Sequence, residues 1–151
     1  MVRNTHLVEL GCHYDKYGCL VPVESESGEL PFRLNRIYYI YQVKDGVRRG
    51  FHSHVDLEQV LICVSGQVKI QVKTPFEEED ILLDDPRKGL YIGPMVWREM
   101  YDFSPDAVLL GLASKHYDVN DYIRDYEEYE DMALTYFAQT NHEGKGSLDK
   151  K

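Results

Sequence analysis

Apolar residues between positions 19 and 114 fall into short runs that turn residues separate. Over residues 67–73, valine and isoleucine alternate with polar side chains, which is typical of a strand with one buried face. Asp45-Gly46 and Ser65-Gly66 end two such runs and indicate turns. On this pattern we expect strands over residues 19–23, 36–43, 59–64, 67–73, 80–83, 89–92, 97–103 and 107–114.

No helical pattern interrupts these runs, and this absence predicts an all-β fold. A unit in which a helix joins two parallel strands needs a helical segment between the strands, and this part of the sequence has none. Strands at such regular spacing favour an antiparallel sandwich or barrel.

The period changes after the last strand, where we expect a helix. Tyr122, Tyr126 and Tyr129 follow the spacing of one helix face, and acidic residues lie largely on the opposite face. We therefore predict a C-terminal α-helix packed on the outside of the barrel. Asp118 or Asn120 is expected to cap its start.

Length and composition indicate one domain. The chain has 151 residues, of which 43% are hydrophobic and 28% charged, the usual balance of a globular domain. We expect a single domain over residues 1–140 and a flexible tail over 141–151, where the sequence becomes polar and contains glycine. The longest apolar run, 107–113, is far shorter than the roughly 20 residues of a membrane-spanning helix.

The net charge argues against two classes of binding partner, and the cysteine spacing argues against two kinds of cysteine site. The 26 acidic residues outnumber the 17 basic ones, and the formal charge of −9 disfavours nonspecific binding to nucleic acid or to an anionic membrane. Cys12, Cys19 and Cys63 show no CxxC spacing, so we expect neither a disulfide framework nor a cysteine zinc site. No apolar secretion signal follows Met1, and both observations favour a cytoplasmic protein.

A histidine pair carries the strongest chemical signal. Residues two apart in a strand point to the same face, so we expect His52 and His54 to project into one space. The spacing from Gly46 through both histidines to Gln59 resembles the first motif of the cupin barrels. Metal-binding cupins have glutamate in place of Gln59, and the later segment 89–100 contains no third histidine.

These two imidazoles form an incomplete metal site. Catalytic zinc usually has three protein ligands, and an amide is a poor ligand. We expect no metal and no other cofactor, and we assign the pair to acid–base chemistry, because near neutral pH one imidazole can accept a proton while its neighbour delivers one. Two interpretations stay open beside this one: a metal site, and two hydrogen-bonded histidines that only stabilise the mouth of the barrel.

Arginines and aromatic residues flank the histidine pair along the chain. The set comprises Arg36, Arg48, Arg49, Tyr91, Trp97 and Arg98. Guanidinium groups match phosphate oxygens in a bidentate manner, so a local basic cleft on this acidic protein suits a diphosphate. Aromatic rings can stack on a base or pack on a sugar face. Each arginine alone is more typical of the surface, but their grouping near the histidines favours a phosphorylated ligand.

At these residues the sequence resembles the dTDP-sugar 3,4-ketoisomerases of deoxysugar biosynthesis. The most specific element is Arg49-Gly50-Phe51-His52-Ser53-His54 followed by Leu57-Glu58-Gln59. The likeness spans residues 14–131 and includes these further segments: Pro31-Phe32, Arg36-Ile37-Tyr38-Tyr39-Ile40, Gly89-Leu90-Tyr91-Ile92-Gly93-Pro94, Val96-Trp97 and Asp121-Tyr122-Ile123-Arg124.

The resemblance implies a cupin or jelly-roll barrel that moves the ketone of dTDP-4-dehydro-6-deoxyglucose from C4 to C3 without metal or cofactor. It implies that His52 takes the C3 proton to give an enediol, and that His54 moves protons between the two oxygens and C4. It also implies a homodimer that exchanges residues 1–24, and a role in making 3-amino-3,6-dideoxyhexoses for bacterial glycans. The implied substrate contacts are Tyr17, Arg36, Tyr38, Arg49, Gln59, Tyr91, Trp97 and Arg98.

Two positions depart from many members of that family. Tyr17-Gly18 stands where many have Arg-Gly, and Trp97-Arg98 stands where many have Trp-His. If both positions line the sugar pocket, they alter the face at which C4 is reprotonated, and the 3-keto product is then gluco- or galacto-configured. We predict the gluco product of the quinovose-type branch, because the residues associated with the galacto outcome are absent.

Other functions remain open at this point. A sugar-nucleotide 3,5-epimerase would use a similar metal-free barrel and exchange protons at C3 and C5. A metal-dependent cupin oxygenase would contain iron, and a sugar-binding cupin module would bind the nucleotide sugar without turnover.

Overall fold

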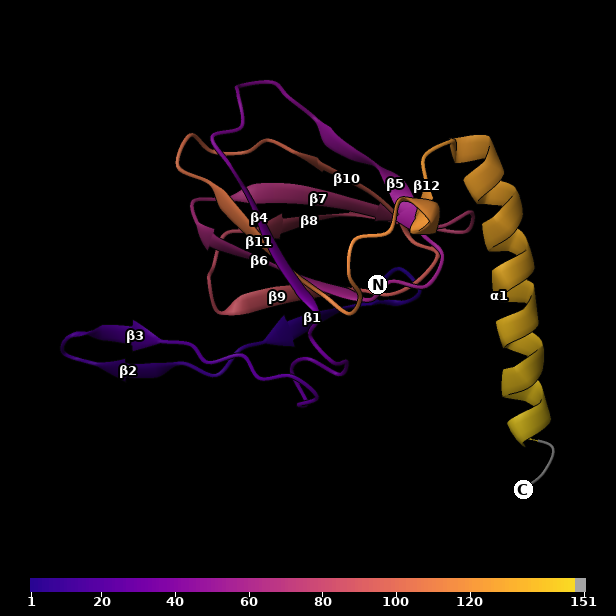
Figure 1. The fold of residues 1–151 in the computed structure, drawn as a ribbon, viewed down its shortest axis with the longest axis horizontal. Helices are drawn as coiled ribbons and strands as arrows, with labels where there is room; N and C mark the ends of the chain where they lie inside the picture. Colours follow the sequence, from indigo (N-terminus) through magenta and orange to yellow (C-terminus); the bar gives the residue numbers. More distant parts are fainter. Residues whose placement is uncertain (149–151) are drawn as a thin grey trace.

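Two five-stranded sheets make up most of the molecule in the computed structural model, which describes residues 1–148 (Figure 1). The first sheet has the strand order β1 (Thr5–Glu9), β9 (Lys88–Ile92), β6 (Gln59–Ser65), β11 (Val108–Ala113) and β4 (Arg36–Tyr41). The second sheet has the order β12 (Tyr122–Ile123), β5 (Arg49–His54), β10 (Trp97–Tyr101), β7 (Val68–Lys73) and β8 (Glu78–Leu83). All pairings in these sheets are antiparallel, so the prediction of an all-β jelly-roll barrel is confirmed.

The hydrophobic core lies between the two sheets. Val68, Ile70 and Val72 of β7 are fully buried and alternate with half-buried polar residues, as the sequence pattern predicts. These side chains belong to one cluster with Leu61 and Leu90 of the first sheet. Burying apolar surface between the sheets stabilises the barrel and holds the strands around its interior in fixed positions.

β6 is buried on both of its faces because the segment between β3 and β4 folds over the first sheet. Leu30 and Phe32 of this segment pack with Val60, Ile62 and Leu112. The alternate side chains of β6 lie in the core between the sheets. This double burial explains why β6 is a continuous apolar run rather than an alternating one.

A separate hairpin of β2 (His13–Asp15) and β3 (Gly18–Leu20) projects from the barrel (Figure 1). The strand that we expected over residues 19–23 therefore ends at Leu20. The sequence pattern also missed β1 and β2. β1 is an edge strand with only two buried side chains, too few for a clear apolar alternation.

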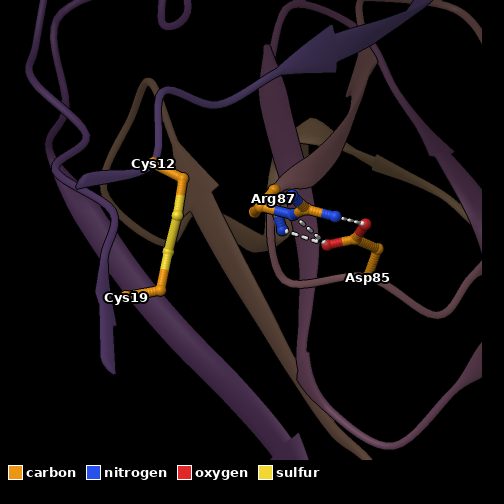
Figure 2. The surroundings of a disulfide bond; sticks show 4 residues. All are labelled: Cys12, Cys19, Asp85 and Arg87. Carbon is orange, nitrogen blue, oxygen red and sulfur yellow. Dashed lines mark hydrogen bonds and ion pairs between the residues drawn. A yellow bond between two sulfur atoms is a disulfide. The ribbon is translucent and has the colours of Figure 1, made fainter. Parts of the chain in front are cut away.

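Cys12 and Cys19 form a disulfide at the hairpin, with their Cα atoms 6.1 Å apart (Figure 2). The expectation of no disulfide is wrong for this pair. Two antiparallel strands bring these positions together, and a spacing of seven residues does not reveal the turn that does so. Figure 2 also shows the ion pair of Arg87 with Asp85 near the disulfide.

A C-terminal helix, α1 (Tyr126–Leu148), packs beside the barrel, which confirms the expected helix (Figure 1). Its cap is Asp125, whose carboxylate accepts the N–H of Glu128 at 3.0 Å. Asp118 and Asn120 are therefore wrong as caps of this helix. Asp118 instead caps a short 3₁₀ helix, η1 (Val119–Asp121), and Tyr122 lies in β12 rather than in α1.

The helix α1 extends further than the sequence predicts. It continues past residue 141, where we expected the tail to begin, as far as Leu148. The last part of that predicted tail, residues 149–151, lies outside the described residues. Within residues 1–148, no helix combines the length and apolar composition needed to cross a membrane.

Candidate active site

A cavity of about 350 Å³ opens between the two sheets, a size that suits a small-molecule site. Strands β4 and β6 supply one wall, β5 and β10 supply another, and the segment around β12 closes one side. The cavity is lined by Arg36, Tyr38, Ile40, Arg49, Gly50, His52, His54, Gln59, Met100, Tyr117, Tyr122 and Arg124.

An irregularity in β5 places the histidine pair at the cavity. Opposite β10, His52 pairs with Arg98 and Gly50 pairs with the next residue, so Phe51 is an extra residue and forms a bulge. Gly50 has φ +95°, and a Cβ there would lie 2.9 Å from the carbonyl oxygen of Arg98. Glycine is therefore required at this close approach. Beyond the bulge, normal alternation brings His52 and His54 to the same side.

The two imidazoles lie against each other and against a tyrosine. The ring centroids of His52 and His54 are 4.9 Å apart with the planes nearly perpendicular. Tyr122 lies 4.4 Å from the His54 ring and 5.1 Å from the His52 ring, centroid to centroid. His54 is only 2% exposed, and its Nδ1 lies 2.9 Å from Oδ2 of Asp121.

Both histidines are neutral near pH 7. Burial, and next to it the positive charge of Arg98, lowers the pKa of His52 to about 4. The same two causes lower the pKa of His54 far below its ordinary value. Each ring therefore carries a nitrogen lone pair that can accept a proton.

Arg98 is a fully buried cation behind the pair. Its Nη2 donates to the carbonyl oxygen of Val96 at 3.1 Å, while its Nε and Nη1 have no hydrogen-bond partner among the described residues. Burial lowers the pKa of Arg98 to about 10, which still leaves the guanidinium charged at neutral pH. A fixed positive charge in a site of low polarity can stabilise negative charge that develops on a substrate.

Tyr38 and Gln59 form a hydrogen-bonded pair on the wall opposite β5. The Tyr38 hydroxyl donates to Oε1 of Gln59 at 2.5 Å. Burial raises the pKa of Tyr38 to about 12, so the phenol stays protonated. The ring fits inside the barrel because Gly111 lies opposite it in β11, where a Cβ would come within 2.2 Å of the ring.

Three arginines line the cavity: Arg36, Arg49 and Arg124. Of the sequence-predicted arginines, Arg48 lies elsewhere, because its Nε donates to Glu99 at 2.7 Å. No Asp or Glu lines the cavity within the described part of the chain. The site is therefore locally basic on an acidic protein, as a diphosphate requires.

Four of the residues expected to contact substrate do not line the cavity in this chain: Tyr17, Tyr91, Trp97 and Arg98, the last of which is fully buried behind the histidine pair. Trp97 points from β10 toward α1 and donates to Glu99 at 2.8 Å. Tyr91 points to the outer side of β9 and donates to Glu58 at 2.7 Å. Both follow from strand alternation, since their neighbours in β9 and β10 face the core. Tyr17, at the turn of the hairpin, is 84% exposed.

The structure adds lining residues that the sequence analysis missed. Tyr117, Tyr122 and Arg124 come from the segment that leads into α1, where the tyrosine spacing predicted a helix face. For Tyr122 and Arg124 the sequence did contain a signal, because both lie in Asp121-Tyr122-Ile123-Arg124, one of the segments that carry the family resemblance. Ile40 follows directly from the alternation that brings Arg36 and Tyr38 inward.

The residues at the cavity do not fit a cupin metal site. Within residues 1–148, no group of three or more His, Cys, Asp or Glu side chains is arranged to hold a metal ion. Gln59 takes the place of the metal-binding glutamate and is engaged by Tyr38. Two imidazoles and one amide fall short of the three-ligand set of catalytic zinc.

One family model and one characterised relative each match most of this chain. The model of the FdtA family (WxcM-like, C-terminal) matches residues 3–134. The TDP-4-oxo-6-deoxy-alpha-D-glucose-3,4-oxoisomerase of Aneurinibacillus thermoaerophilus is 44% identical over 132 residues, which are 87% of this chain and 91% of the relative.

Solved structures show the same likeness. QdtA, a sugar 3,4-ketoisomerase from Thermoanaerobacterium thermosaccharolyticum solved with TDP, is 51% identical with a TM-score of 0.88, over 91% of this chain and 99% of that chain. Its variants include a histidine-to-asparagine change, solved with TDP-4-keto-6-deoxyglucose, and a double change of tyrosine to arginine and arginine to histidine. The WlaRB TDP-quinovose 3,4-ketoisomerase of Campylobacter jejuni is 42% identical with a TM-score of 0.83, over 86% of this chain and 99% of that chain.

Proposed function

This chain belongs to the FdtA family, and we propose that it is a sugar-nucleotide 3,4-ketoisomerase. It converts dTDP-4-dehydro-6-deoxy-D-glucose into dTDP-3-dehydro-6-deoxy-D-glucose, for the synthesis of 3-amino-3,6-dideoxyhexoses of bacterial glycans. The observation that carries the proposal is the pair of neutral imidazoles, His52 and His54, at one basic cavity. Proton transfer next to a carbonyl needs a base that is unprotonated at the working pH, and each ring of the pair meets this condition.

In the first proposed step, His52 removes the proton from C3. The carbonyl at C4 makes this proton acidic, and the electron pair of the broken bond forms a C3=C4 double bond while negative charge collects on O4. The buried guanidinium of Arg98 stabilises this charge. The proton lies on His52, which was neutral beforehand because of burial and Arg98.

In the second proposed step, His54 moves a proton from O3 to O4. The proton that His52 took up, or one exchanged for it with solvent, then passes through His54 to C4, which turns O3 into the ketone oxygen and O4 into the hydroxyl and leaves both rings neutral. One proton leaves C3 and one arrives at C4, so the reaction is balanced without an oxidant or a reductant.

Arg36, Arg49 and Arg124 are the proposed diphosphate ligands. They are the cationic side chains that line the cavity among the described residues. Holding the remote diphosphate positions the hexose over the histidine pair, which lowers the entropic cost of reaching the reacting geometry. Tyr38, Gln59 and Tyr122 lie where they can contact the sugar.

We also propose that the product has the gluco configuration at C4 and that the protein is a homodimer. Tyr17 and Arg98 are of the same residue types, tyrosine and arginine, as the two residues that the double variant of QdtA replaces by arginine and histidine. Arg98 lies behind the histidine pair, but Tyr17 is exposed on the hairpin. In a homodimer, the hairpin of one protomer can bring Tyr17 to the cavity of its partner. β1 pairs with β9 of its own chain, so in the proposed exchange the hairpin is the part of residues 1–24 that reaches the partner.

Proton NMR with dTDP-4-dehydro-6-deoxyglucose tests the function. In H₂O we expect a 3-keto product with a large diaxial H4–H5 coupling. In D₂O we expect deuterium at C4 of the product and at C3 of the recovered substrate. Deuterium at C5 with the ketone still at C4 would show an epimerase, and binding without turnover would show a sugar-binding module. A small H4–H5 coupling would overturn the gluco assignment alone.

The role of His52 is tested by His52→Asn. We expect turnover to fall by roughly 10²–10⁴-fold, because the base is lost, while dTDP binding measured by calorimetry stays. His116→Asn, at an exposed position outside the cavity, is the matched control and keeps full activity. Near-normal turnover of His52→Asn would contradict its assignment as the base.

We also propose a cytoplasmic location. The structure has Cys12 and Cys19 joined by a disulfide, and in a reducing compartment we expect this bond to be opened to two thiols. Alkylation in intact cells followed by unfolding should label all three cysteines. Labelling of Cys63 alone would contradict this location.

A further inference from the structure

The carboxylate of Asp121 faces the side of His54 that points away from the cavity. We propose that Asp121 is a positioning residue that holds the proton of His54 on Nδ1 and leaves Nε2 unprotonated toward the cavity. The consequence for catalysis rests on the proposed function, whereas the tautomer itself does not.

The backbone holds this carboxylate in place. Oδ2 of Asp121 lies 2.9 Å from Nδ1 of His54, while Oδ1 accepts the backbone N–H of Asp56 at 3.0 Å. The carbonyl oxygen of Asp121 accepts the N–H of Val55 at 3.1 Å. Tyr122, the next residue, pairs with His54 in the β12–β5 ladder. The loop that carries the carboxylate is thus fastened to the strand that carries the imidazole.

This geometry decides which nitrogen of His54 carries the proton. An ionised carboxylate only accepts hydrogen bonds, so the nitrogen next to it must be an N–H donor. A neutral imidazole has one proton, and placing it on Nδ1 leaves the lone pair on Nε2. Burial, followed by the charge of Arg98, lowers the pKa of His54 and keeps the ring in this neutral form.

The tautomer matters because His54 must first accept a proton in the proposed reaction. Nε2 with a free lone pair can take the O3 proton and pass it to O4. The opposite tautomer presents an N–H to the cavity and cannot accept there. Asp121 does not line the cavity, so it acts through His54 and not on the substrate.

Asp121→Asn tests the proposal with little change in shape. The asparagine oxygen can still accept the N–H of Asp56, while its amide donates to Nδ1 of His54 and moves the ring proton to Nε2. Long-range ¹H–¹⁵N NMR of histidine-labelled protein reports the tautomer, and His54→Asn identifies the His54 signals by their loss. We expect Nδ1–H in the parent protein and Nε2–H in Asp121→Asn.

The kinetic signature separates this role from a structural one. We expect Asp121→Asn to slow isomerisation on the order of 10²–10⁴-fold, as for a base held in the wrong tautomer, and to change KM little. Deuterium exchange at C3 in D₂O should persist, because His52 and not His54 performs that step. Equal loss of exchange and isomerisation would overturn the positioning role.

Asp118→Asn is the matched control. It removes the same charge from the segment that carries Asp121, and asparagine caps η1 as well as aspartate does. We expect the parent tautomer and the parent rate. A His54 proton on Nε2 in the parent protein overturns the proposal even if Asp121→Asn fails to fold. A parent protein that has the expected tautomer but no isomerase activity overturns the proposed function instead.

Discussion

Arg98 adds its positive charge to the effect of burial, and together they lower the pKa of both histidines. It is completely buried and has no acidic partner within 4.0 Å among the described residues. Such a cation is costly to bury, and replacing a buried charge by an apolar side chain of similar volume is often neutral or stabilising. Its position beside two imidazoles whose pKa it lowers indicates a functional rather than a stabilising role.

Arg98→Met should therefore separate stability from activity. We expect the unfolding temperature not to fall, while kcat falls on the order of 10²–10³-fold because the charge on O4 loses its stabilising cation. The pKa of His52 should rise above about 4, though burial keeps it below the ordinary value. Calorimetry, kinetics and NMR titration of His52 provide the measurements, with exposed Arg33→Met as control.

The pH dependence of activity follows from the lowered pKa of His52. The neutral ring is the active base, so activity is present above about pH 4 and is lost as pH falls through about 4. We predict that kcat/KM at pH 5.5 equals its value at pH 7, whereas a histidine with an ordinary pKa would lose about tenfold. An acidic limb centred near pH 6.5 in the rate profile would contradict this prediction.

At the scale of a single element, the active site depends on the bulge in β5. It combines Gly50 in the left-handed region, the extra residue Phe51, and the register shift against β10. Together they turn the end of the strand so that Arg49 and the histidine pair all reach the cavity. β12 then pairs with this end and brings Tyr122 to the rings.

Gly50→Ala should damage the site more than a comparable glycine change elsewhere. Gly46 also has a positive φ, of +76°, but nothing lies within 4 Å of the Cβ that Gly46→Ala would add. At Gly50 the new Cβ would meet the backbone of Arg98 at 2.9 Å. We expect Gly46→Ala to cost only its strain, about 1–2 kcal/mol, and Gly50→Ala to cost more and to lose activity as well. Equal unfolding free energies and full activity in both variants would contradict the role of the bulge.

At the scale of the whole molecule, the projecting hairpin bears on whether one chain alone forms a complete active site. Tyr14 and Tyr17 on the hairpin are more than four-fifths exposed, and Tyr39 on the outer face of β4 is 64% exposed. Exposed aromatic rings in such number are typical of a surface that a partner covers. The arrangement agrees with the proposed dimer, in which each cavity draws residues from both chains.

Complementation between two impaired variants tests this exchange. His52→Asn lacks the base, and Tyr17→Asp places a charge on the hairpin tip that should disturb the cavity of the partner. If the hairpins are exchanged, a heterodimer of the two has one intact site, and it should recover about half of the parent activity. Differently tagged chains allow its purification. A heterodimer that recovers no activity, or a parent protein that sediments as a monomer, would contradict the exchange of hairpins.

The sequence alone determined the parts of this protein that depend on local periodicity. Alternation predicted β7 and the shared face of His52 and His54, and the absence of helical segments predicted an all-β barrel. These inferences succeeded because a strand has a period of two wherever it occurs, and one buried face imposes that period on the residues.

Only the tertiary structure decided which distant residues meet. Asp121 is 67 positions from His54, and nothing in the spacing of either residue encodes their contact. Tyr122 follows a helical spacing, yet pairing with β5 places it in a strand at the cavity. Tyr91 and Trp97 lie on the cavity strands or their neighbours but face away from the cavity, while the buried Arg98 faces the pair. Local pattern sets the faces of an element, whereas the packing of elements sets what each face meets.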